Sequence, residues 1–242
     1  MKAWLTIALM LVLPQVASAE DLTLFTVTDG ETTQDYSMKL KILFFMTFLT
    51  VMPILVLLCT PFTRILIVLG ILRQALGLQQ SPPNKVLVGI ALCLTMLIMR
   101  PEFTEIYEKA YLPYEAGEIT TQEGIDIAED PIREFMFRQT NEKALEQMLL
   151  IADEPLTLEK DDVPFSVLMP AFVLSELKTA LQIGFMLFIP FLVIDLIVAS
   201  VLMAMGMMML SPLIISLPFK LMIFVLVDGW ALTVGTLTRS FG

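Results

Sequence analysis

The chain contains 242 residues, a length that allows one or two domains. Apolar residues make up 57% of it and charged residues 17%, against roughly 45–50% and about 25% in soluble domains, so the composition is that of a membrane protein. The absence of histidine excludes an imidazole base, a histidine zinc ligand and a Ser-His-Asp triad, and the net charge of −10 excludes a basic nucleic-acid surface.

Residues 1–19 have the pattern of a secretory signal peptide. Lys2 supplies a basic start, residues 3–16 are mostly apolar, and Ala17-Ser18-Ala19 forms a small-residue cleavage site. The alternative is an uncleaved first transmembrane helix, but the apolar stretch is shorter than the roughly 20 residues that a span requires. We therefore predict a cleaved signal peptide, followed by a polar periplasmic leader over residues 20–41.

A first helical hairpin is predicted over residues 42–99. Its first apolar run, residues 42–63, is long enough to span a membrane, whereas the second, residues 86–99, would rise only about 21 Å as a helix. The basic loop between them, residues 64–85, has no acidic residue, so the positive-inside rule places it in the cytoplasm. The residues assigned to topology and to the turn are Arg64, Arg73, Pro82, Pro83, Asn84 and Lys85.

The Pro82-Pro83-Asn84 sequence in this loop predicts a rigid turn. Prolines end a preceding helix and asparagine favours the start of the next one. Docking of a partner on the same loop is a second interpretation that the residues leave open.

Residues 100–163 form an acidic block with 17 acidic and 6 basic residues, a net charge of −11 that leaves +1 for the rest of the chain. Thr120 and Glu123 have the spacing of a capping box, and Asp130-Pro131 is a candidate start of a further helix. Apolar residues after Pro131 follow helical spacing. The block is therefore predicted to be a helical region on the periplasmic side.

A C-terminal helical hairpin is predicted over residues 164–242. Two long helices are expected with a turn near Met207–Pro212, where Gly206, Ser211 and Pro212 are the local helix breakers. Glu176 and Lys220 lie in the two apolar segments, where an isolated charge is costly. A structural ion pair between them, within one protomer or between protomers, is favoured over a proton relay, because no histidine extends a relay.

Five methionines fall within residues 203–209. Methionine commonly fills a protein core, but its unbranched thioether side chain also adapts to changing contours. An apolar constriction of such side chains could close a pore by excluding water.

Three stretches resemble one family: residues 64–77 with the following Pro82-Pro83-Asn84, residues 170–178, and residues 191–220. This ordered series, together with Asp-Pro-Ile-Arg-Glu-Phe at 130–135 and the signal peptide, is similar to the FliP family of flagellar type III export-gate membrane proteins. The resemblance covers residues 37–241.

The resemblance implies an all-α, membrane-associated protein of helical hairpins with a helical periplasmic insertion, which assembles into a pore-forming oligomer. A homo-oligomer, a pentamer in the family, would combine with the export-gate subunits FliQ and FliR and with other type III export proteins in the inner membrane, at the flagellar basal body. Unfolded export substrates would pass through it, among membrane lipids. The methionines assigned to its pore gasket are Met205, Met207, Met208 and Met209.

The alternative from another class is a small-solute or proton transporter that uses Glu176, Asp195, Lys220 and Asp228. No internal repeat supports it. Asp195 and Asp228 also lack the Gly-x-Gly-Asp context of an intramembrane aspartyl protease. We therefore expect no enzymatic activity, no cofactor or metal, and no nucleic-acid partner.

Overall fold

Every element of the described residues is helical, which confirms the predicted all-α class. The computed structural model describes residues 33–78, 80–156, 158, 160–207 and 210–241. The predicted signal peptide and most of the leader therefore lie outside the described residues. The elements are α2 (Thr33–Leu58), α3 (Phe62–Ala75), α4 (Asn84–Ile98), α5 (Arg100–Ile106), η1 (Tyr107–Tyr111), α6 (Leu112–Glu115), α7 (Thr121–Gln139), α8 (Glu142–Ile151), η2 (Lys160–Asp162), α9 (Phe165–Ala204), α10 (Pro212–Leu226) and α11 (Gly229–Arg239).

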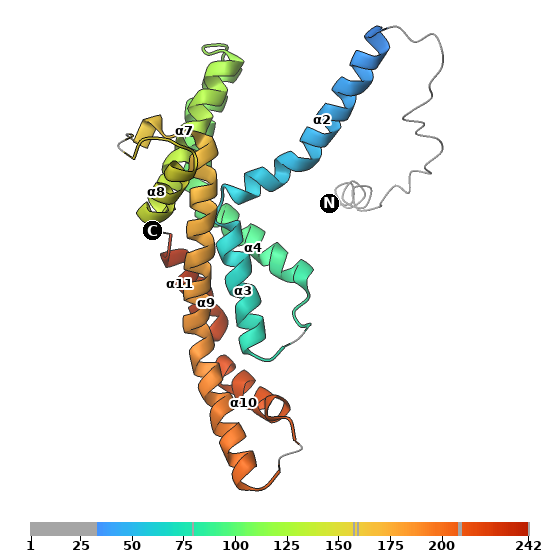
Figure 1. Cartoon of the computed structure of the whole chain (residues 1–242), viewed down its shortest axis with the longest axis vertical. Coiled ribbons are helices and arrows are strands. Elements are labelled where there is room, and N and C mark those ends of the chain that lie inside the picture. The colour runs from blue at the N-terminus through green and yellow to red at the C-terminus, as the bar shows by residue number, and fades with distance from the viewer. Residues whose placement is uncertain (1–32, 79, 157, 159, 208–209, 242) are drawn as a thin grey trace, which may run out of the picture. The chain divides into compact units, whose positions relative to one another are not determined.

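The chain divides into two units, residues 1–50 and residues 51–242, and all packing described below lies within the second. Its central element is α9, a helix of 40 residues and therefore about 60 Å long. Helices α7 and α8 pack on the first half of α9, α3 lies along its middle, and α10 packs on its second half (Figure 1).

Glycine permits the close contact between α3 and α9. Gly184 of α9 faces Ile71 of α3, and a Cβ at residue 184 would lie 2.3 Å from Ile71 Cδ1. A side chain at residue 184 would therefore require Ile71 to shift. Around it, the main core joins α3, α4, α7, α8, α9 and the C-terminal residues through side chains that include Ile65, Leu69, Phe135, Leu168, Phe172 and Phe241.

The predicted basic loop at residues 64–85 is wrong in its first half. Residues 62–75 form α3, and its apolar side chains Ile65, Val68 and Leu72 are buried against α9 and its neighbours. The connection to α4 is only residues 76–83. Positive charge near an apolar run suggested a loop, but the apolar residues of α3 recur at helical spacing and find a core to occupy.

The acidic region is helical, as predicted, and its capping box is confirmed. Thr120 Oγ1 accepts a hydrogen bond from the Glu123 N–H, and the Glu123 carboxylate accepts one from the Thr120 N–H. The helix start expected at Asp130-Pro131 is wrong, because α7 runs through Pro131 from residue 121 to residue 139. Phe135 and Met136 are buried, in agreement with the amphipathic pattern.

The C-terminal hairpin has its turn where the sequence places it, with α9 ending at Ala204 and α10 beginning at Pro212. The second long helix is in fact two. Asp228 adopts a left-handed backbone conformation (φ 49°) between α10 and α11, and the two helices meet at an angle of 65°. Gly229 allows this bend, since a Cβ there would lie 2.2 Å from the Phe224 ring.

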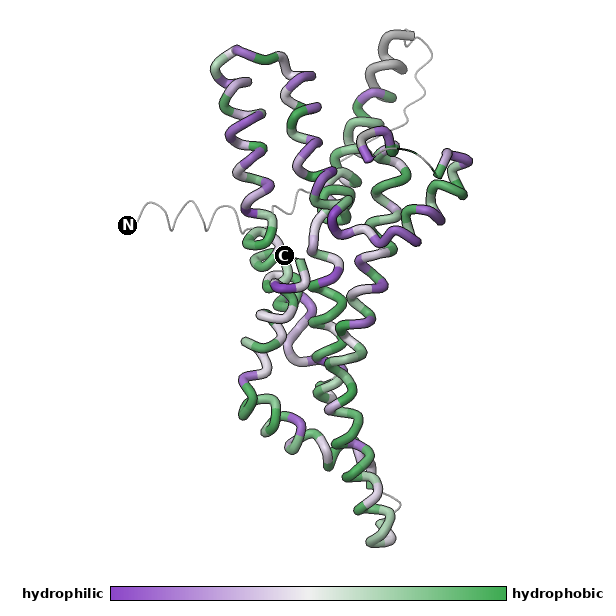
Figure 2. Tube along the Cα trace, turned by 90° about the vertical axis from the view of Figure 1, so that its left-hand side faces the viewer, coloured by the Kyte–Doolittle hydropathy of each residue, from purple (hydrophilic) through white to green (hydrophobic). Residues whose placement is uncertain are grey.

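Among the described residues, two helices are long and apolar enough to cross a membrane: Leu40–Leu58 within α2, and α9. The number rises to four if α4 with α5–α6, and α10 with α11, each count as one bent span. The most apolar window of the first is 0% buried and that of α9 is 11% buried within the chain. Figure 2 shows hydrophobic residues concentrated along the second half of α9 and along α10. Much of this apolar surface therefore has no cover within residues 51–242.

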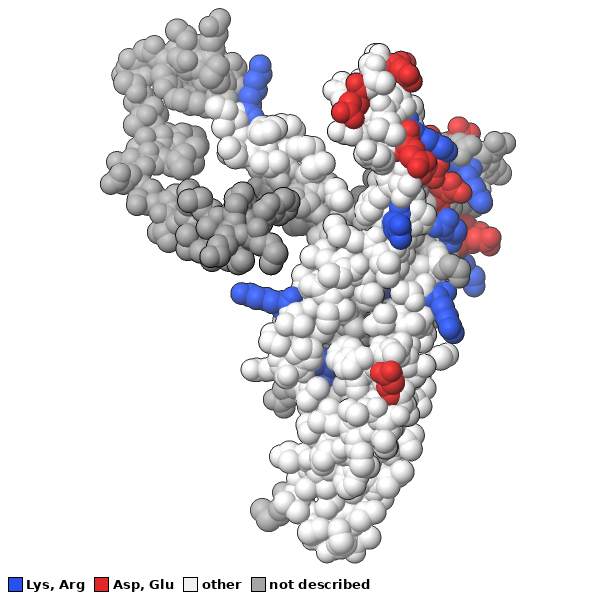
Figure 3. Space-filling view, turned by 180° about the vertical axis from the view of Figure 1, so that it is seen from behind, with Lys and Arg blue, Asp and Glu red and all other residues white. Residues whose placement is uncertain are grey.

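Within the larger unit, charged side chains are concentrated away from the apolar second half of α9 and α10. On the face in Figure 3, acidic and basic side chains gather over the end that carries α7 and α8, whereas the opposite end is almost free of charge. This unit consequently has a water-compatible end and an end suited to lipid or protein neighbours.

Candidate functional site

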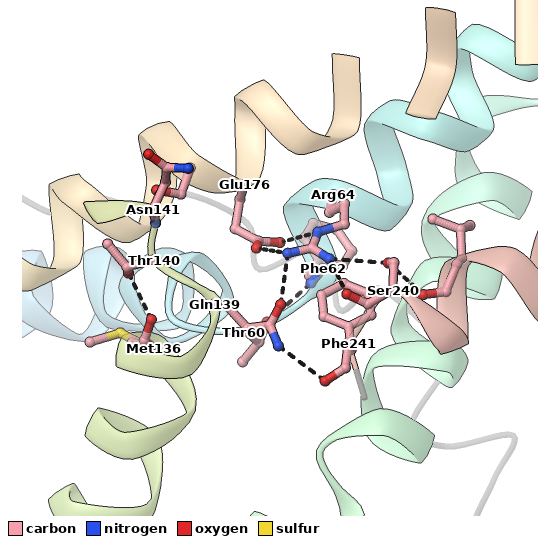
Figure 4. A network of polar contacts seen from close by, with 12 residues as sticks. Thr60, Phe62, Arg64, Met136, Gln139, Thr140, Asn141, Glu176, Ser240 and Phe241 are labelled. Carbon is pink, nitrogen blue, oxygen red and sulfur yellow. Dashed lines mark hydrogen bonds and ion pairs between the residues drawn. The ribbon is translucent and has the colours of Figure 1, made fainter. Parts of the chain in front are cut away.

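The first candidate site is a buried ionic centre around Arg64 of α3 (Figure 4). Its Nε donates to Glu176 Oε2 at 3.0 Å, and its Nη2 donates to Glu176 Oε1 and to Gln139 Oε1. Its Nη1 donates to the main-chain oxygen and to the hydroxyl oxygen of Ser240, at 2.9 and 3.0 Å. All five N–H groups of the guanidinium are therefore used.

This centre joins segments that are far apart in the sequence. Arg64 comes from α3, Gln139 from the end of α7, Glu176 from α9 and Ser240 from the residues after α11. Gln139 also donates to the main-chain oxygen of Phe241, and the Phe241 ring lies 3.8 Å from the Arg64 guanidinium carbon. Arg64 is 2% exposed and Glu176 is 0% exposed, so the pair depends on this complete set of partners.

A second ionic centre lies around Lys220 of α10, which is 1% exposed. Its Nζ donates to Asp195 Oδ2 of α9 at 2.6 Å and to the main-chain oxygen of Ala75 at 3.1 Å. The Ser216 hydroxyl donates to the other oxygen of Asp195. This centre connects the C-terminal hairpin to the last residue of α3.

Within one protomer these contacts correct the predicted Glu176–Lys220 pair, since each residue has a different partner there. Glu176 and Asp195 are 19 residues apart on one helix, a rise of about 28 Å, so one lysine does not reach both. The sequence predicts Arg64 as a residue that sets the membrane topology, and it indicates Asp195 only as a candidate transporter or protease residue. The ionic partners of these residues depend on which helices pack together, and the spacing of residues along the chain does not predict that packing.

The turn between α3 and α4 is held by Arg73. Its Nη1 donates to the main-chain oxygen of Pro82 at 3.1 Å and to Asn84 Oδ1 at 2.6 Å. Asn84 is the first residue of α4, with Pro83 preceding it as the N-cap, so the asparagine side chain serves the turn rather than the cap. Lys85 is exposed beside it.

Of the four methionines assigned to the gasket, Met205 and Met207 are described, with exposed fractions of 58% and 37%. Met208 and Met209 lie outside the described residues. An apolar groove of about 430 Å³ runs between α9 and α10 on the approach to this turn, lined by residues that include Ile197, Val201, Met205, Ile215 and Phe219. Met205 and Met207 are thus exposed within the single chain.

The fold and these two centres define an all-helical membrane protein whose charges are neutralised inside a helical core while its apolar helices remain uncovered. Among the described residues, no group of three or more aspartate, glutamate or cysteine side chains is arranged to hold a metal ion. A sequence model described as "FliP family" matches residues 45–237.

Relatives carrying the description "Flagellar biosynthetic protein FliP" are similar over most of their length. The protein of Bacillus subtilis is 49% identical over 92% of this chain and 99% of its own. The proteins of Cereibacter sphaeroides and Pectobacterium carotovorum are each 52% identical, over 89% and 86% of this chain and 72% and 81% of their own. The chain belongs to the FliP family, which confirms the resemblance found in its sequence and is consistent with a subunit of the flagellar export gate.

Proposed function

We propose that several copies of this chain surround a channel through which unfolded flagellar proteins cross the bacterial inner membrane. The observation that carries the proposal is the uncovered apolar surface of α9 and α10, which includes Phe185, Met186, Ile197 and Ile214 at exposed fractions of 58–74%. Apolar surface on this scale requires lipid or protein neighbours. A homo-oligomer, a pentamer as the family resemblance implies, with FliQ and FliR as additional subunits, would supply protein neighbours.

A non-enzymatic role agrees with the chemistry of the buried charges. Glu176 and Asp195 each accept hydrogen bonds from a basic side chain, and both ionic centres tie helices together. The transporter alternative requires Glu176, Asp195, Lys220 and Asp228 to share one site. The ~28 Å rise between the first two along α9 argues against that arrangement.

The orientation that we propose places the acidic helices on the periplasmic side. Leu55 and Val56 of α2 line one pocket together with Ile125 and Ile132 of α7, so the end of α2 lies at the level of the acidic helices. If the leader before α2 is also periplasmic, α2 does not cross the membrane and packs against neighbouring subunits. A cysteine at Gly117 should then react with a membrane-impermeant thiol reagent added outside the inner membrane, in a background with Cys59 and Cys93 replaced by serine. Reaction only after the inner membrane is opened would reverse the orientation.

The methionine turn is proposed as the seal of the channel. Alanine at Met207, Met208 and Met209 removes three flexible apolar side chains per copy, so the assembled variant should conduct ions. Met186→Ala on the exposed side of α9 is the matched control. The measurement combines membrane abundance, assembly and ion leak. A triple variant that assembles at the normal level without leaking refutes the seal, and lowered abundance without leak indicates core packing.

A further inference from the structure

One carboxylate in the C-terminal hairpin has no partner among the described residues. Asp228, at the bend between α10 and α11, is exposed, and its side chain makes no hydrogen bond or ion pair in this part of the chain. It is the N-cap residue of α11, a position where aspartate commonly accepts a hydrogen bond from a backbone N–H, but it makes no such bond. By contrast, Glu176 and Asp195 each have a basic partner. The Asp228 carboxylate is therefore available to a group outside the chain.

The residues around Asp228 form an apolar surface without cover in the chain. Val225, Leu226, Val227 and Trp230 have exposed fractions between 41% and 75%. Contiguous exposed apolar surface of this kind is typical of a contact with protein or lipid. Water is consequently a poor neighbour for the bend.

Lipid is an equally poor neighbour, because of the level at which the charge lies. Phe224, one helical turn before Asp228, packs on Phe191 of α9 with 6.3 Å between the ring centroids. Phe191 lies about 20 Å along α9 from Lys178 on one side and from Ala204, the end of the helix, on the other. A hydrocarbon core of roughly 30 Å crossed by this part of α9 would have the carboxylate near its centre, where an ionised side chain is costly. A protein neighbour that carries a positive charge suits both the apolar surface and the carboxylate.

The chain itself carries a matching positive charge at Lys85, the second residue of α4. Its side chain is exposed, and over the described ranges it makes no hydrogen bond or ion pair. It lies at the positive end of the helix dipole, where a lysine is unfavourable unless an anion is close. Leu92 and Met96, on the same face of α4, are 40% and 70% exposed. Lys85 therefore begins a second apolar surface without cover, with a charge opposite to that of the bend.

Lys85 and Asp228 lie at similar levels along α9. The start of α4 is held to α3 by Arg73, just beyond the contact of α3 with Gly184 of α9. Gly184 and Phe191, which mark the two levels, are only about 10 Å apart along α9. In Figure 1, α4 extends outward from α3, whereas α11 lies on the other side of α9. One copy does not pair the two residues, but a neighbouring copy turned about an axis parallel to α9 brings them together.

We propose that Lys85 of one copy of this chain forms an ion pair with Asp228 of the next copy, with the exposed face of α4 packed against the α10–α11 bend. The inference rests on the proposed function, because it requires several copies side by side. A second copy brings the charge that the carboxylate lacks, at a similar level and on an apolar face. The contact joins two different surfaces, so it repeats from copy to copy and closes a ring when the rotation permits.

Removal of the two charges in turn tests the pair. Lys85→Asp places two carboxylates together and should lower the assembled fraction several-fold at unchanged membrane abundance. Adding Asp228→Asn removes the repulsion and should restore part of the loss, and asparagine tolerates the left-handed backbone as aspartate does. The matched control is Lys143→Asp, because Lys143 is exposed and is the second residue of α8, as Lys85 is of α4. This control should leave assembly unchanged. A double variant that assembles no better than Lys85→Asp overturns the pair.

Cross-linking locates the contact with both charges intact, and it decides the question if the charge variants do not accumulate. Val86→Cys is placed in one copy and Val227→Cys in a second, differently tagged copy, in a background with Cys59 and Cys93 replaced by serine. Both valines are exposed neighbours of the paired residues. A short bifunctional thiol reagent should join the two tags in the assembled complex. Leu150→Cys, which is exposed on α8, should give no such product in place of Val86→Cys.

The outcomes separate this contact from the proposed function. A complex with several copies that gives no cross-link between residues 86 and 227 overturns the contact and leaves the proposed channel standing. Cross-linking of Val227→Cys to a different subunit also overturns it, because the carboxylate then faces that subunit. If native mass spectrometry of the parent complex finds only one copy of this chain, the proposed function is refuted instead.

Discussion

Replacement of Arg64 by methionine should be among the most destabilising single substitutions in this chain. The change leaves the Glu176 carboxylate, which is 0% exposed, without its cation. Removing one partner of a buried ion pair costs about 3–5 kcal/mol, because the other charge stays buried and uncompensated. A typical domain has only about 5–15 kcal/mol of stability in total, so the variant should lose a large share of it.

The double variant Arg64→Met with Glu176→Met distinguishes this explanation from a general packing defect. With both charges removed, the main remaining cost is at Gln139 and Ser240, which lose the hydrogen bonds from Arg64. Three such hydrogen bonds are lost, to the main-chain and hydroxyl oxygens of Ser240 and to Gln139 Oε1, at about 1 kcal/mol each, so the double variant should lose about 3 kcal/mol. Arg64→Met alone loses the same three bonds and also leaves the Glu176 carboxylate without its cation. The two substitutions together should therefore be milder than Arg64→Met alone, with an interaction energy well outside additivity.

The assay is denaturant unfolding of the purified chain in mild detergent, with Arg100→Met as the control. Arg100 is exposed, and surface substitutions usually change stability by no more than about 0.5 kcal/mol. A double variant as unstable as the sum of its single changes would show that the pair is not the source of the loss. A stable Arg64→Met variant would refute the reasoning entirely.

Three further outcomes are expected. Lys220→Glu should impair assembly, and adding Asp195→Lys should restore part of it, because the two exchange charges across a 2.6 Å contact. Gly184→Ala should destabilise the chain by about 1–3 kcal/mol through overpacking against α3, whereas Gly70→Ala, with no atom near its Cβ, should gain up to about 1 kcal/mol of helix propensity. Hydrogen bonds from the backbone N–H and the hydroxyl of Thr120, the N-cap residue, hold the Glu123 pKa below its ordinary value of 4.5. The ionised carboxylate therefore stabilises the start of α7 above pH 4.5. This stabilisation is lost as the pH falls through the lowered pKa.

Each outcome has a result that contradicts it. Rescue of Lys220→Glu by Glu176→Lys, measured as assembled complex in the membrane, would restore the pairing predicted from sequence. Equal unfolding midpoints for the two glycine variants would show that the helix crossing has free space. For Glu123, hydrogen exchange of the first-turn amides of α7, normalised to an unstructured peptide, should lose protection as the pH falls below 4.5 and through the lowered pKa, and Glu123→Gln should remove this pH dependence. An unchanged pH profile in that variant would assign the effect to other carboxylates.

The local features of this chain follow from neighbouring residues, and they were predictable for that reason. The capping box at Thr120 needs only residues three apart, and the hairpin turn after Ala204 needs only the local breakers Gly206 and Pro212. Predictions were wrong where a contact between distant segments overrode a rule based on neighbouring residues. Arg64 counted as a cytoplasmic charge because an exposed arginine is the usual case, yet α9 supplies a carboxylate that allows its burial.

By itself the sequence determined the all-helical class, the apolar surface suited to a membrane assembly and, through ordered motifs, membership of the FliP family. Only the tertiary structure decided which charges neutralise one another, because Arg64 and Glu176 are 112 residues apart and Lys220 and Asp195, 25 residues apart, lie on different helices. Opposite charges in apolar segments must find partners, but the choice among Arg64, Asp195, Glu176 and Lys220 depends on where long helices cross. Those crossings are determined by the packing of whole helix faces, as at Gly184, and not by the spacing of the charged residues along the chain.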